Sequence, residues 1–224
     1  MTNTTIAGKT ALVTGGGRGL GQAAAEALAA AGARVAVADM NADNAAAVAN
    51  ALGGETETLA VTVDVADSAQ VQRTVDTVVE QFGGIDIVVH VAGISRGPTQ
   101  KGPDGWLPIQ DVSQEDWNRV LQVNLSGTFF VDQTAARIMI PRGWGRIINV
   151  ASMSGSVANK GLAGLAPYNA SKGGVIALTK ALAVEWAPYN ISVNCISPGY
   201  MATEMGKRSQ TIPGFRELQL DQTP

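Results

Sequence analysis

The stretch that decides the fold is Thr10–Gly21, with the sequence TALVTGGGRGLG. Its first five residues are apolar or β-branched, which predicts a buried strand. The glycine-rich segment Gly15–Gly21 follows at once and leads into an Ala-rich stretch, which predicts a helix. A strand, a glycine turn and a helix in this order form the context of a dinucleotide-binding site. Glycines let the backbone approach a pyrophosphate, and the helix N-terminus offers free N–H groups to that anion.

Short apolar runs alternate with helix-like segments along the rest of the chain. Strands are predicted at Thr10–Thr14, Arg34–Ala38, Thr58–Val63, Ile85–Val91, Arg146–Ala151 and Ile191–Ile196. Helices are predicted to begin near Gly19, Asn41, Ser68, Ser113 and Pro167, with Ser68 as an N-cap and Pro167 in a first turn. Strands that are apolar on both faces and separated by helices indicate a parallel sheet. We therefore predict one domain over residues 1–224, an α/β fold with a doubly wound parallel sheet of the Rossmann type.

The composition excludes several functional classes. The 224 residues are 46% hydrophobic and 16% charged, which is typical of a globular chain, and a net charge of -3 does not favour nucleic acid as a partner. The single cysteine, Cys195, has no partner for an internal disulfide, and in its apolar strand we expect an inert core thiol. The sequence shows neither a signal peptide nor an apolar stretch of ~18 residues. We expect a cytoplasmic protein with no membrane partner and no metal site.

Asp39 ends the second predicted strand, close to the offset at which an acid meets the adenosine ribose of a dinucleotide. A carboxylate there accepts hydrogen bonds from ribose hydroxyls and repels a 2′-phosphate. The next residues, Met40 and Asn41, carry no positive charge that would compensate. NAD(H) is therefore predicted, and NADP(H) is less favoured. The alternative is that Asp39 caps the helix that begins near Asn41.

Tyr168 and Lys172 are four residues apart at the start of a predicted helix, so their side chains share a face. Tyrosine ordinarily titrates near pH ~10. A nearby ammonium group, together with oxidised nicotinamide, favours the phenolate and is expected to lower the pKa of Tyr168. This pair after the fifth strand of a dinucleotide fold indicates a general acid/base unit.

At this point the chain resembles the short-chain dehydrogenase/reductase family from Lys9 to about Met205. The resemblance rests on motifs that occur in the family's order: Thr14-Gly15-Gly16-Gly17-Arg18-Gly19-Leu20-Gly21, Asp64-Val65, Ala92-Gly93, Asn124, Ser152, Tyr168-x-x-x-Lys172 and Pro198-Gly199. It implies a catalytic set of Asn124, Ser152, Tyr168 and Lys172. It also implies that the protein is dimeric or tetrameric, as the family usually is, with contacts through the long helices that begin near Ser113 and Pro167.

The resemblance further assigns residues to the cofactor. The phosphate loop would use Gly15, Gly17, Arg18, Gly19 and Leu20, and the adenine end would use Asp64 and Val65. Ala92 and Gly93 would line the cofactor, while Pro198, Gly199, Met201 and Thr203 would hold the nicotinamide side. Lys172 would also bind the nicotinamide ribose, and Asn124 would support a water-linked proton relay to Lys172.

By the same resemblance, Ser152 would bind the substrate oxygen that Tyr168 protonates or deprotonates. The family's usual gap between this serine and the tyrosine is a few residues shorter. Ser154 is therefore an alternative, because positions 152 and 154 of an extended chain point the same way. The register of the strand that ends near Val150 favours Ser152.

The chain departs from the family's pattern in two places. Family members often have Asn-Asn before Ala-Gly, whereas this chain has His90-Val91. We interpret His90, the only histidine, as structural rather than as a catalytic base. Family members also usually continue with a further strand and helix, so the resemblance implies that a C-terminal strand and helix are missing here, in a truncated or shortened chain. That absence puts the usual oligomer interface in doubt.

Three functional hypotheses remain from the sequence. The first is an NAD(H)-dependent oxidoreductase that interconverts a secondary alcohol, such as a polyol or sugar, and its ketone. Ser152–Gly155 and Glu185–Ala187 resemble the sugar- and polyol-oxidising members. The second is a 3-oxoacyl thioester reductase, and the third is a non-catalytic NAD-binding protein. Substrate specificity is expected to lie in the loop Arg96–Gln110 and in a lid, Gly206–Phe215.

Overall fold

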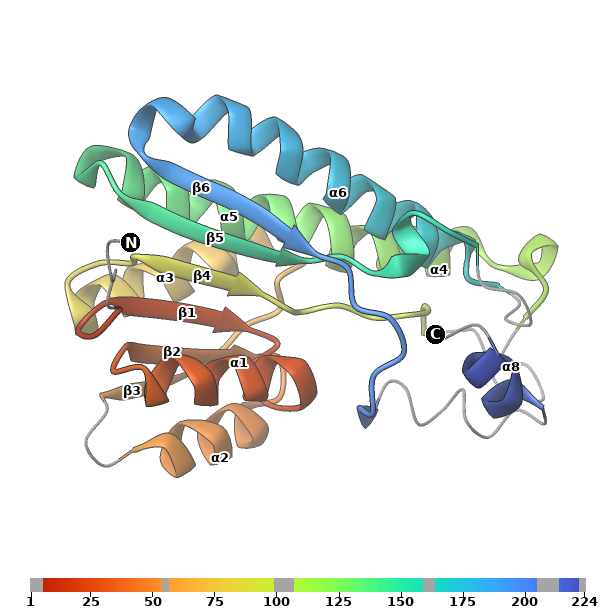
Figure 1. Ribbon diagram of the computed structural model, residues 1–224, viewed down its shortest axis with the longest axis horizontal. Helices are drawn as coiled ribbons and strands as arrows, with labels where there is room; N and C mark the ends of the chain where they lie inside the picture. Colours follow the sequence, from red (N-terminus) through yellow and green to blue (C-terminus); the bar gives the residue numbers. More distant parts are fainter. Residues whose placement is uncertain (1–5, 54–56, 99–106, 159–163, 205–213, 222–224) are drawn as a thin grey trace.

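The computed structural model describes residues 6–53, 57–98, 107–158, 164–204 and 214–221. Six parallel strands form one sheet in the order β3-β2-β1-β4-β5-β6. The strands are β1 (Thr10–Thr14), β2 (Arg34–Asp39), β3 (Thr58–Thr62), β4 (Ile87–His90), β5 (Gly145–Val150) and β6 (Ile191–Ile196). In Figure 1 all of their arrowheads point the same way. The predicted α/β fold with a doubly wound parallel sheet is therefore confirmed, and each predicted strand agrees with an observed strand to within two residues at either end.

Helices cover both faces of this sheet. They are α1 (Gly19–Ala30), α2 (Ala42–Leu52), α3 (Ser68–Phe82), α4 (Gln114–Leu121), α5 (Gly127–Met139) and α6 (Ala166–Trp186). A further helix, α8 (Phe215–Asp221), lies apart from the sheet in Figure 1. A π-helix, Gln122–Ser126, joins α4 to α5. Short 3₁₀-helices lie at Ile109–Asp111, Ile140–Arg142, Met153–Gly155 and Ala187–Tyr189. None of the helices in the described part of the chain is long and apolar enough to cross a membrane.

Two apolar cores hold the layers together. Side chains of α3, α5 and α6 pack on one face of the sheet with Leu12, Val88 and Ile147. Side chains of α1 and α2 pack on the other face with Val13, Val35 and others. The alternation of strand residues between the two cores explains why the strands read as apolar runs in the sequence.

Helix starts follow local capping chemistry. The Asn41 side chain accepts a hydrogen bond from Asn44 N and caps α2, and Ser113 caps α4 in the same way through Asp116 N. Pro167 lies in the first turn of α6, as predicted. The predicted cap of α3 is wrong by one residue, since Asp67 rather than Ser68 accepts from the backbone N–H groups of Ala69 and Gln70. A carboxylate accepts these bonds more strongly than a hydroxyl.

The last described segment, Phe215–Asp221, is helical, and no helix was predicted there from the sequence. Of the predicted lid, residues 206–213 lie outside the described residues, as do residues 99–106 of the predicted specificity loop.

Candidate active site

A cavity of about 350 Å³ opens at the edge of the sheet where the strands end. The chain reverses its course across the sheet between β3 and β4, so the turns after β1 and β4 diverge around this crevice. Most of the residues predicted for the cofactor and the chemistry line it: Gly15, Arg18, Gly19, Leu20, Asp39, Asp64, Val65, Ala92, Gly93, Ser152, Tyr168, Lys172, Pro198, Gly199, Met201 and Thr203. Two predicted site residues, Gly17 and Asn124, are not part of its lining.

The glycine loop has the shape that a pyrophosphate requires. Gly15 has φ +65°, and a Cβ on Gly15 would lie 2.7 Å from Ala92 N. A Cβ on Gly21 would lie 2.0 Å from the carbonyl oxygen of Gly15. The described side chains include none that caps α1 at Arg18, and its first turn carries no acidic residue. The N-terminus of α1 thus keeps N–H groups for an anion, and this loop fits a dinucleotide phosphate.

Asp39 faces the glycine loop at the end of β2. Its Oδ2 accepts a hydrogen bond from Gly17 N at 3.0 Å, and its Oδ1 accepts one from Asn41 N at 3.0 Å. The alternative role of Asp39 as the cap of α2 is wrong, because Asn41 is the cap. The carboxylate is instead fixed at the cavity wall beside the phosphate loop.

Asp64 is held by three neighbours at the mouth of the cavity. Its Oδ1 accepts from Ala66 N at 3.0 Å, its backbone N donates to Gln70 Oε1 at 3.0 Å, and its Oδ2 is 3.0 Å from Arg119 Nη2. Sequence reasoning missed Arg119, which also lines the cavity. No local motif marks it, since it lies 55 residues from its partner, on α4.

Asn124 sits in the π-helix and clamps the segment that follows β4. Its Oδ1 accepts from Ile94 N and its Nδ2 donates to Ile94 O, each at 2.8 Å. Nδ2 also donates to Ser171 Oγ at 3.0 Å, and that hydroxyl donates to the Tyr168 carbonyl at 2.7 Å. The Asn124 side chain therefore joins two walls of the cavity. Sequence reasoning missed Ser171, although it lies between Tyr168 and Lys172.

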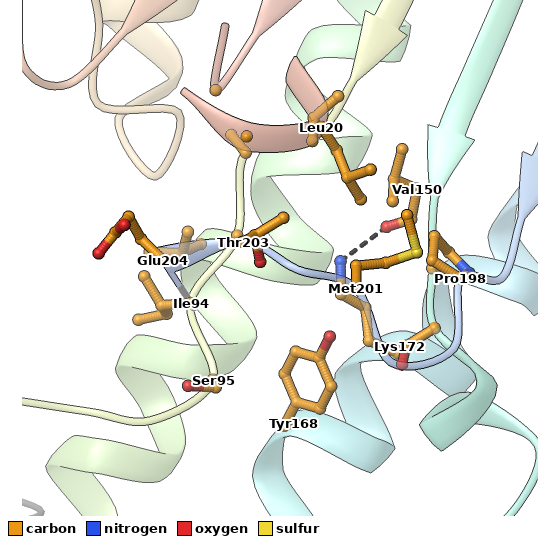
Figure 2. Close-up of a pocket in the computed structure, with 18 of the residues that line it drawn as sticks. Leu20, Ile94, Ser95, Val150, Tyr168, Lys172, Pro198, Met201, Thr203 and Glu204 are labelled. Atoms are coloured by element: carbon orange, nitrogen blue, oxygen red, sulfur yellow. Dashed lines mark hydrogen bonds between the residues drawn. The ribbon is translucent and has the colours of Figure 1, made fainter. Parts of the chain in front are cut away.

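Tyr168 and Lys172 enter the cavity from the first turns of α6, as Figure 2 shows. The ammonium of Lys172 donates to the carbonyl of Val150 at 2.7 Å, the dashed line in Figure 2. It lies 5.8 Å from the centre of the Tyr168 ring. Ser152 lines the cavity together with Tyr168, and its side chain lies near enough to the phenol to act on the Tyr168 pKa. Ser154 is buried beside them, and its backbone N donates to Ser152 Oγ at 3.1 Å.

Burial dominates the electrostatics of this pair. It raises the pKa of Tyr168, although the Ser152 hydrogen bond acts in the opposite direction. It also lowers the pKa of Lys172 to about 8. In the protein by itself the pKa of Tyr168 is thus raised by burial, and the lowering that we expect from Lys172 together with oxidised nicotinamide stays a prediction.

His90 lies in the core and does not line the cavity. Its Nδ1 is 2.8 Å from Thr14 Oγ1 on the neighbouring strand. Burial lowers the pKa of His90 to about 3, with a smaller contribution from the Lys172 charge. A neutral, enclosed imidazole suits the structural role that we predicted.

Cys195 differs from the expectation of a core thiol. It is only partly buried, because β6 is an edge strand whose last residues are exposed. Its sulfur makes a long contact, 3.6 Å, with the carbonyl of Ile196. Within the described ranges, no group of three or more His, Cys, Asp and Glu side chains is placed to hold a metal ion.

Comparison with known proteins agrees with this geometry. Residues 9–212 match the family model described as short chain dehydrogenase. The chain is 42% identical over 207 residues to D-threitol dehydrogenase of Mycolicibacterium smegmatis, covering 92% of this chain and 75% of the relative. It is 35% identical to a 3-oxoacyl-[acyl-carrier-protein] reductase of Synechocystis sp., covering 94% of this chain and 81% of the relative.

Among solved structures, a xylitol dehydrogenase with bound NAD⁺ is similar, with a TM-score of 0.79 and 39% identity over 88% of this chain and 72% of the other. The match to the family model spans every residue that lines the cavity described above. The chain therefore belongs to the short-chain dehydrogenase/reductase family of nicotinamide-dependent oxidoreductases that act on CH–OH groups.

Proposed function

We propose that the protein interconverts a secondary alcohol, of the polyol or sugar class, and its ketone with NAD(H). The observation that carries this proposal is the cavity itself, which is lined by Ser152, Tyr168 and Lys172 and also by the glycine loop and Asp39. It places a hydroxyl pair at one end of a site whose other end fits a dinucleotide.

Each side chain at this end of the cavity has its own role in the proposed reaction. Bound nicotinamide supplies or accepts the hydride. The Tyr168 phenol gives its proton to the ketone oxygen, or takes the proton of the alcohol. Ser152 orients that same oxygen by a hydrogen bond. Lys172 places a positive charge near the phenol and binds the nicotinamide ribose. Ser154, whose backbone N–H supports the Ser152 hydroxyl, is better suited to positioning than to substrate contact.

Asn124 has a positioning role in this proposal. Its side-chain amide is engaged by Ile94 and Ser171. The proton relay that we predicted would therefore have to use its backbone carbonyl, which accepts from Thr128 Oγ1 at 2.7 Å. The relay stays a prediction.

Asp39 supports the preference for NAD(H). Its carboxylate is fixed by two backbone N–H groups at the place where an adenosine ribose would lie beside the phosphate loop. A 2′-phosphate there would meet a negative charge that cannot swing away. NADP(H) is therefore the less favoured cofactor.

The relatives bear on the substrate class. One is a D-threitol dehydrogenase and one is a xylitol dehydrogenase, and both names denote polyols. The 3-oxoacyl reductase among the relatives keeps the thioester reaction as the second candidate. A non-catalytic NAD-binding role is the third, but such a role does not need Ser152 placed on the Tyr168 phenol. Rates of NADH formation with polyols, sugars and hydroxyacyl thioesters distinguish the three.

We also propose that the protein forms a homo-oligomer. Large apolar side chains are exposed on the outer helices, with Trp117 on α4 at 39% and Val184 on α6 at 78%. These helices are the predicted contact faces. Sedimentation equilibrium should give the mass of a dimer or tetramer, and Trp117→Glu should shift it towards the monomer. A monomeric mass for the unaltered protein at micromolar concentration would rule out this assembly.

Tyr168→Phe removes only the phenolic oxygen and should lower kcat on the best polyol by about 10²–10⁴-fold, because the proton then has no donor or acceptor. NADH binding, followed by its fluorescence, should change by less than roughly threefold. Tyr189→Phe makes the same chemical change at an exposed tyrosine that does not line the cavity, and it is the matched control. Turnover by Tyr168→Phe near the unaltered rate would refute the mechanism.

Lys172→Met should abolish turnover and yet stabilise the fold. The pKa of Lys172 falls from 10.5 to about 8 on folding, so below pH 8 the folded protein bears the cost of a buried charge. At pH 7 the variant should gain about 1–3 kcal/mol in free energy of unfolding. The gain should shrink as the pH rises from 8 to 10.5, where the unfolded lysine also loses its proton. Urea unfolding measures this, with the exposed Lys180→Met on the same helix as control.

Asp39→Asn should shift cofactor preference towards NADP(H). The amide still accepts a backbone hydrogen bond but no longer repels a phosphate. The ratio of kcat/KM for NAD to that for NADP should fall at least tenfold, about 1.4 kcal/mol. Asp43→Asn, on the exposed first turn of α2, is the control. An unchanged ratio would show that Asp39 does not set the preference.

A further inference from the structure

A small polar cluster lies inside the otherwise apolar core formed by α3, α5, α6 and the sheet. It consists of Asp132 on α5, Asn149 on β5 and Thr179 on α6. Asp132 and Asn149 are 0% exposed, and Thr179 is 4% exposed. None of these three described residues lines the cavity, and the chemistry proposed above does not use them.

The hydrogen bonds of this cluster leave two oxygens unpaired. Asn149 Nδ2 donates to Asp132 Oδ2 at 2.7 Å and to Thr179 Oγ1 at 3.2 Å. Thr179 Oγ1 donates to the Val175 carbonyl at 2.8 Å. Within the described part of the chain, Asp132 Oδ1 and Asn149 Oδ1 are buried without a hydrogen-bond partner. Two buried acceptors without a donor are unfavourable, and a bare carboxylate is more so.

One proton on Asp132 would satisfy both oxygens. A carboxylic acid and a primary amide form a two-bond ring, in which the amide N–H donates to one acid oxygen and the acid O–H donates to the amide oxygen. The first of these two bonds is the 2.7 Å contact from Asn149 Nδ2 to Asp132 Oδ2. The second would join the two oxygens that are unpaired, Asp132 Oδ1 and Asn149 Oδ1.

Among the described residues around this cluster, none supplies a cation that pairs with Asp132. On the same face of the sheet, β4 contributes His90, whose Cα is paired with that of Asn149 and whose pKa burial holds at about 3. From α6 comes Lys172, whose ammonium binds the Val150 carbonyl. From α3, the buried side chains are Val71, Thr74, Val75, Val78 and Phe82, and none of them carries a charge. Burial raises the pKa of Asp132 to about 7, against the opposing effect of the Asn149 hydrogen bond.

The cluster also connects the elements that carry the proposed chemistry. Asn149 lies three residues before Ser152, and its neighbour Val150 holds Lys172. Thr179 lies two turns beyond Lys172 on α6. Asp132 lies two turns beyond Asn124, in the helix that continues from the π-helix. The three members thus tie the strand that leads to Ser152 to the helices that follow Asn124 and carry Tyr168.

We propose that Asp132 is protonated in the folded protein and forms an acid–amide ring with Asn149, and that this ring is a positioning element of the active site. The ring holds α5 and α6 against β5 through bonds that hydrophobic packing alone does not orient. Loss of the proton would place an unpaired charge at the junction of these three elements.

The proton gives the pH dependence of stability a definite sign. The pKa of Asp132 rises from 3.8 to about 7 on folding. Between these values the folded protein keeps a proton that the unfolded chain has lost, so stability due to Asp132 falls as the pH rises through this window. His90 contributes the opposite trend between pH 3 and 6.5. A comparison with a variant that lacks only the Asp132 titration cancels the His90 contribution.

Asp132→Asn is that variant, because two amides form the same ring without a titrating proton. Urea unfolding of both proteins at pH 5, 6, 7 and 8 gives the ratio of their unfolding equilibrium constants. The unfolding equilibrium constant of the unaltered protein, divided by that of the variant, should rise by on the order of a hundredfold from pH 5 to pH 8. Asp67→Asn makes the same chemical change at an exposed cap whose pKa is lowered, so its ratio should not rise with pH.

Two results would contradict the proposal that Asp132 is protonated in the folded protein. The first is a ratio for Asp132→Asn that is constant across this pH range. The second is an infrared difference spectrum between the two proteins at pH 5 that lacks the band of a protonated carboxylic acid.

The positioning role rests on the proposed function and is tested separately by turnover. Asp132→Leu leaves Asn149 Nδ2 only its bond to Thr179 Oγ1 and should lower kcat about tenfold, while Asp132→Asn should restore kcat to within about threefold of the unaltered protein. The KM for NAD should stay unchanged in both variants. Equal kcat in both variants would overturn the positioning role. If neither the unaltered protein nor any variant turns over a substrate, the proposed function is wrong. The pH dependence of the ratio of unfolding equilibrium constants still tests whether Asp132 is protonated.

Discussion

All six strands run in the same direction, so their carboxyl ends meet at one edge of the sheet. The chain crosses from β1 outward to β3, then returns to place β4 on the other side of β1. The turns after β1 and β4 consequently leave the sheet towards opposite faces, and only small residues fit where they touch. A Cβ on Gly15 would lie within 2.7 Å of the Ala92 backbone, so the contact itself requires glycine. The glycine loop, the segment that Asn124 holds and the first turns of α6 all lie around this point of divergence.

This arrangement is accompanied by the burial of ionisable side chains, which is energetically unfavourable. Lys172, His90 and Asp132 are all buried, and burial shifts each pKa towards the neutral form. Each of the three groups has a different polar partner. The Lys172 ammonium donates to a backbone carbonyl, the neutral His90 imidazole lies beside Thr14, and the Asp132 carboxyl accepts from the Asn149 amide. A site of this kind gives up stability for a fixed geometry of polar groups.

Much of the fold could be predicted because its signals are local. The apolar run Thr10–Thr14 and the glycines after it specify a strand and a turn whatever surrounds them. Asp39 and the Tyr168–Lys172 pair could be found for the same reason, since their meaning follows from their place in the βα alternation. The cap of α3 could not be placed to the residue, because Asp67 and Ser68 are both good caps and the choice depends on backbone geometry at one residue.

Residues that act across long sequence separations could not be found in this way. Arg119 and Ser171 were both missed, because Arg119 meets Asp64 across 55 positions and Ser171 meets Asn124 across 47. The upward direction of the Tyr168 pKa shift follows from burial, which the spacing of Tyr168 and Lys172 in the sequence does not show. The half-exposed position of Cys195 follows from β6 lying at the edge of the sheet.

The number of residues in the π-helix between α4 and α5 sets the rotation of the helix that follows it. An α-helix turns by about 100° per residue, so removing one residue from Gln122–Ser126 would rotate everything beyond it by that angle. Val131 and Ala135 would leave the core, and Asp132 would leave Asn149. A deletion or insertion within the π-helix should therefore disturb the packing of the following elements far more than one in a surface loop.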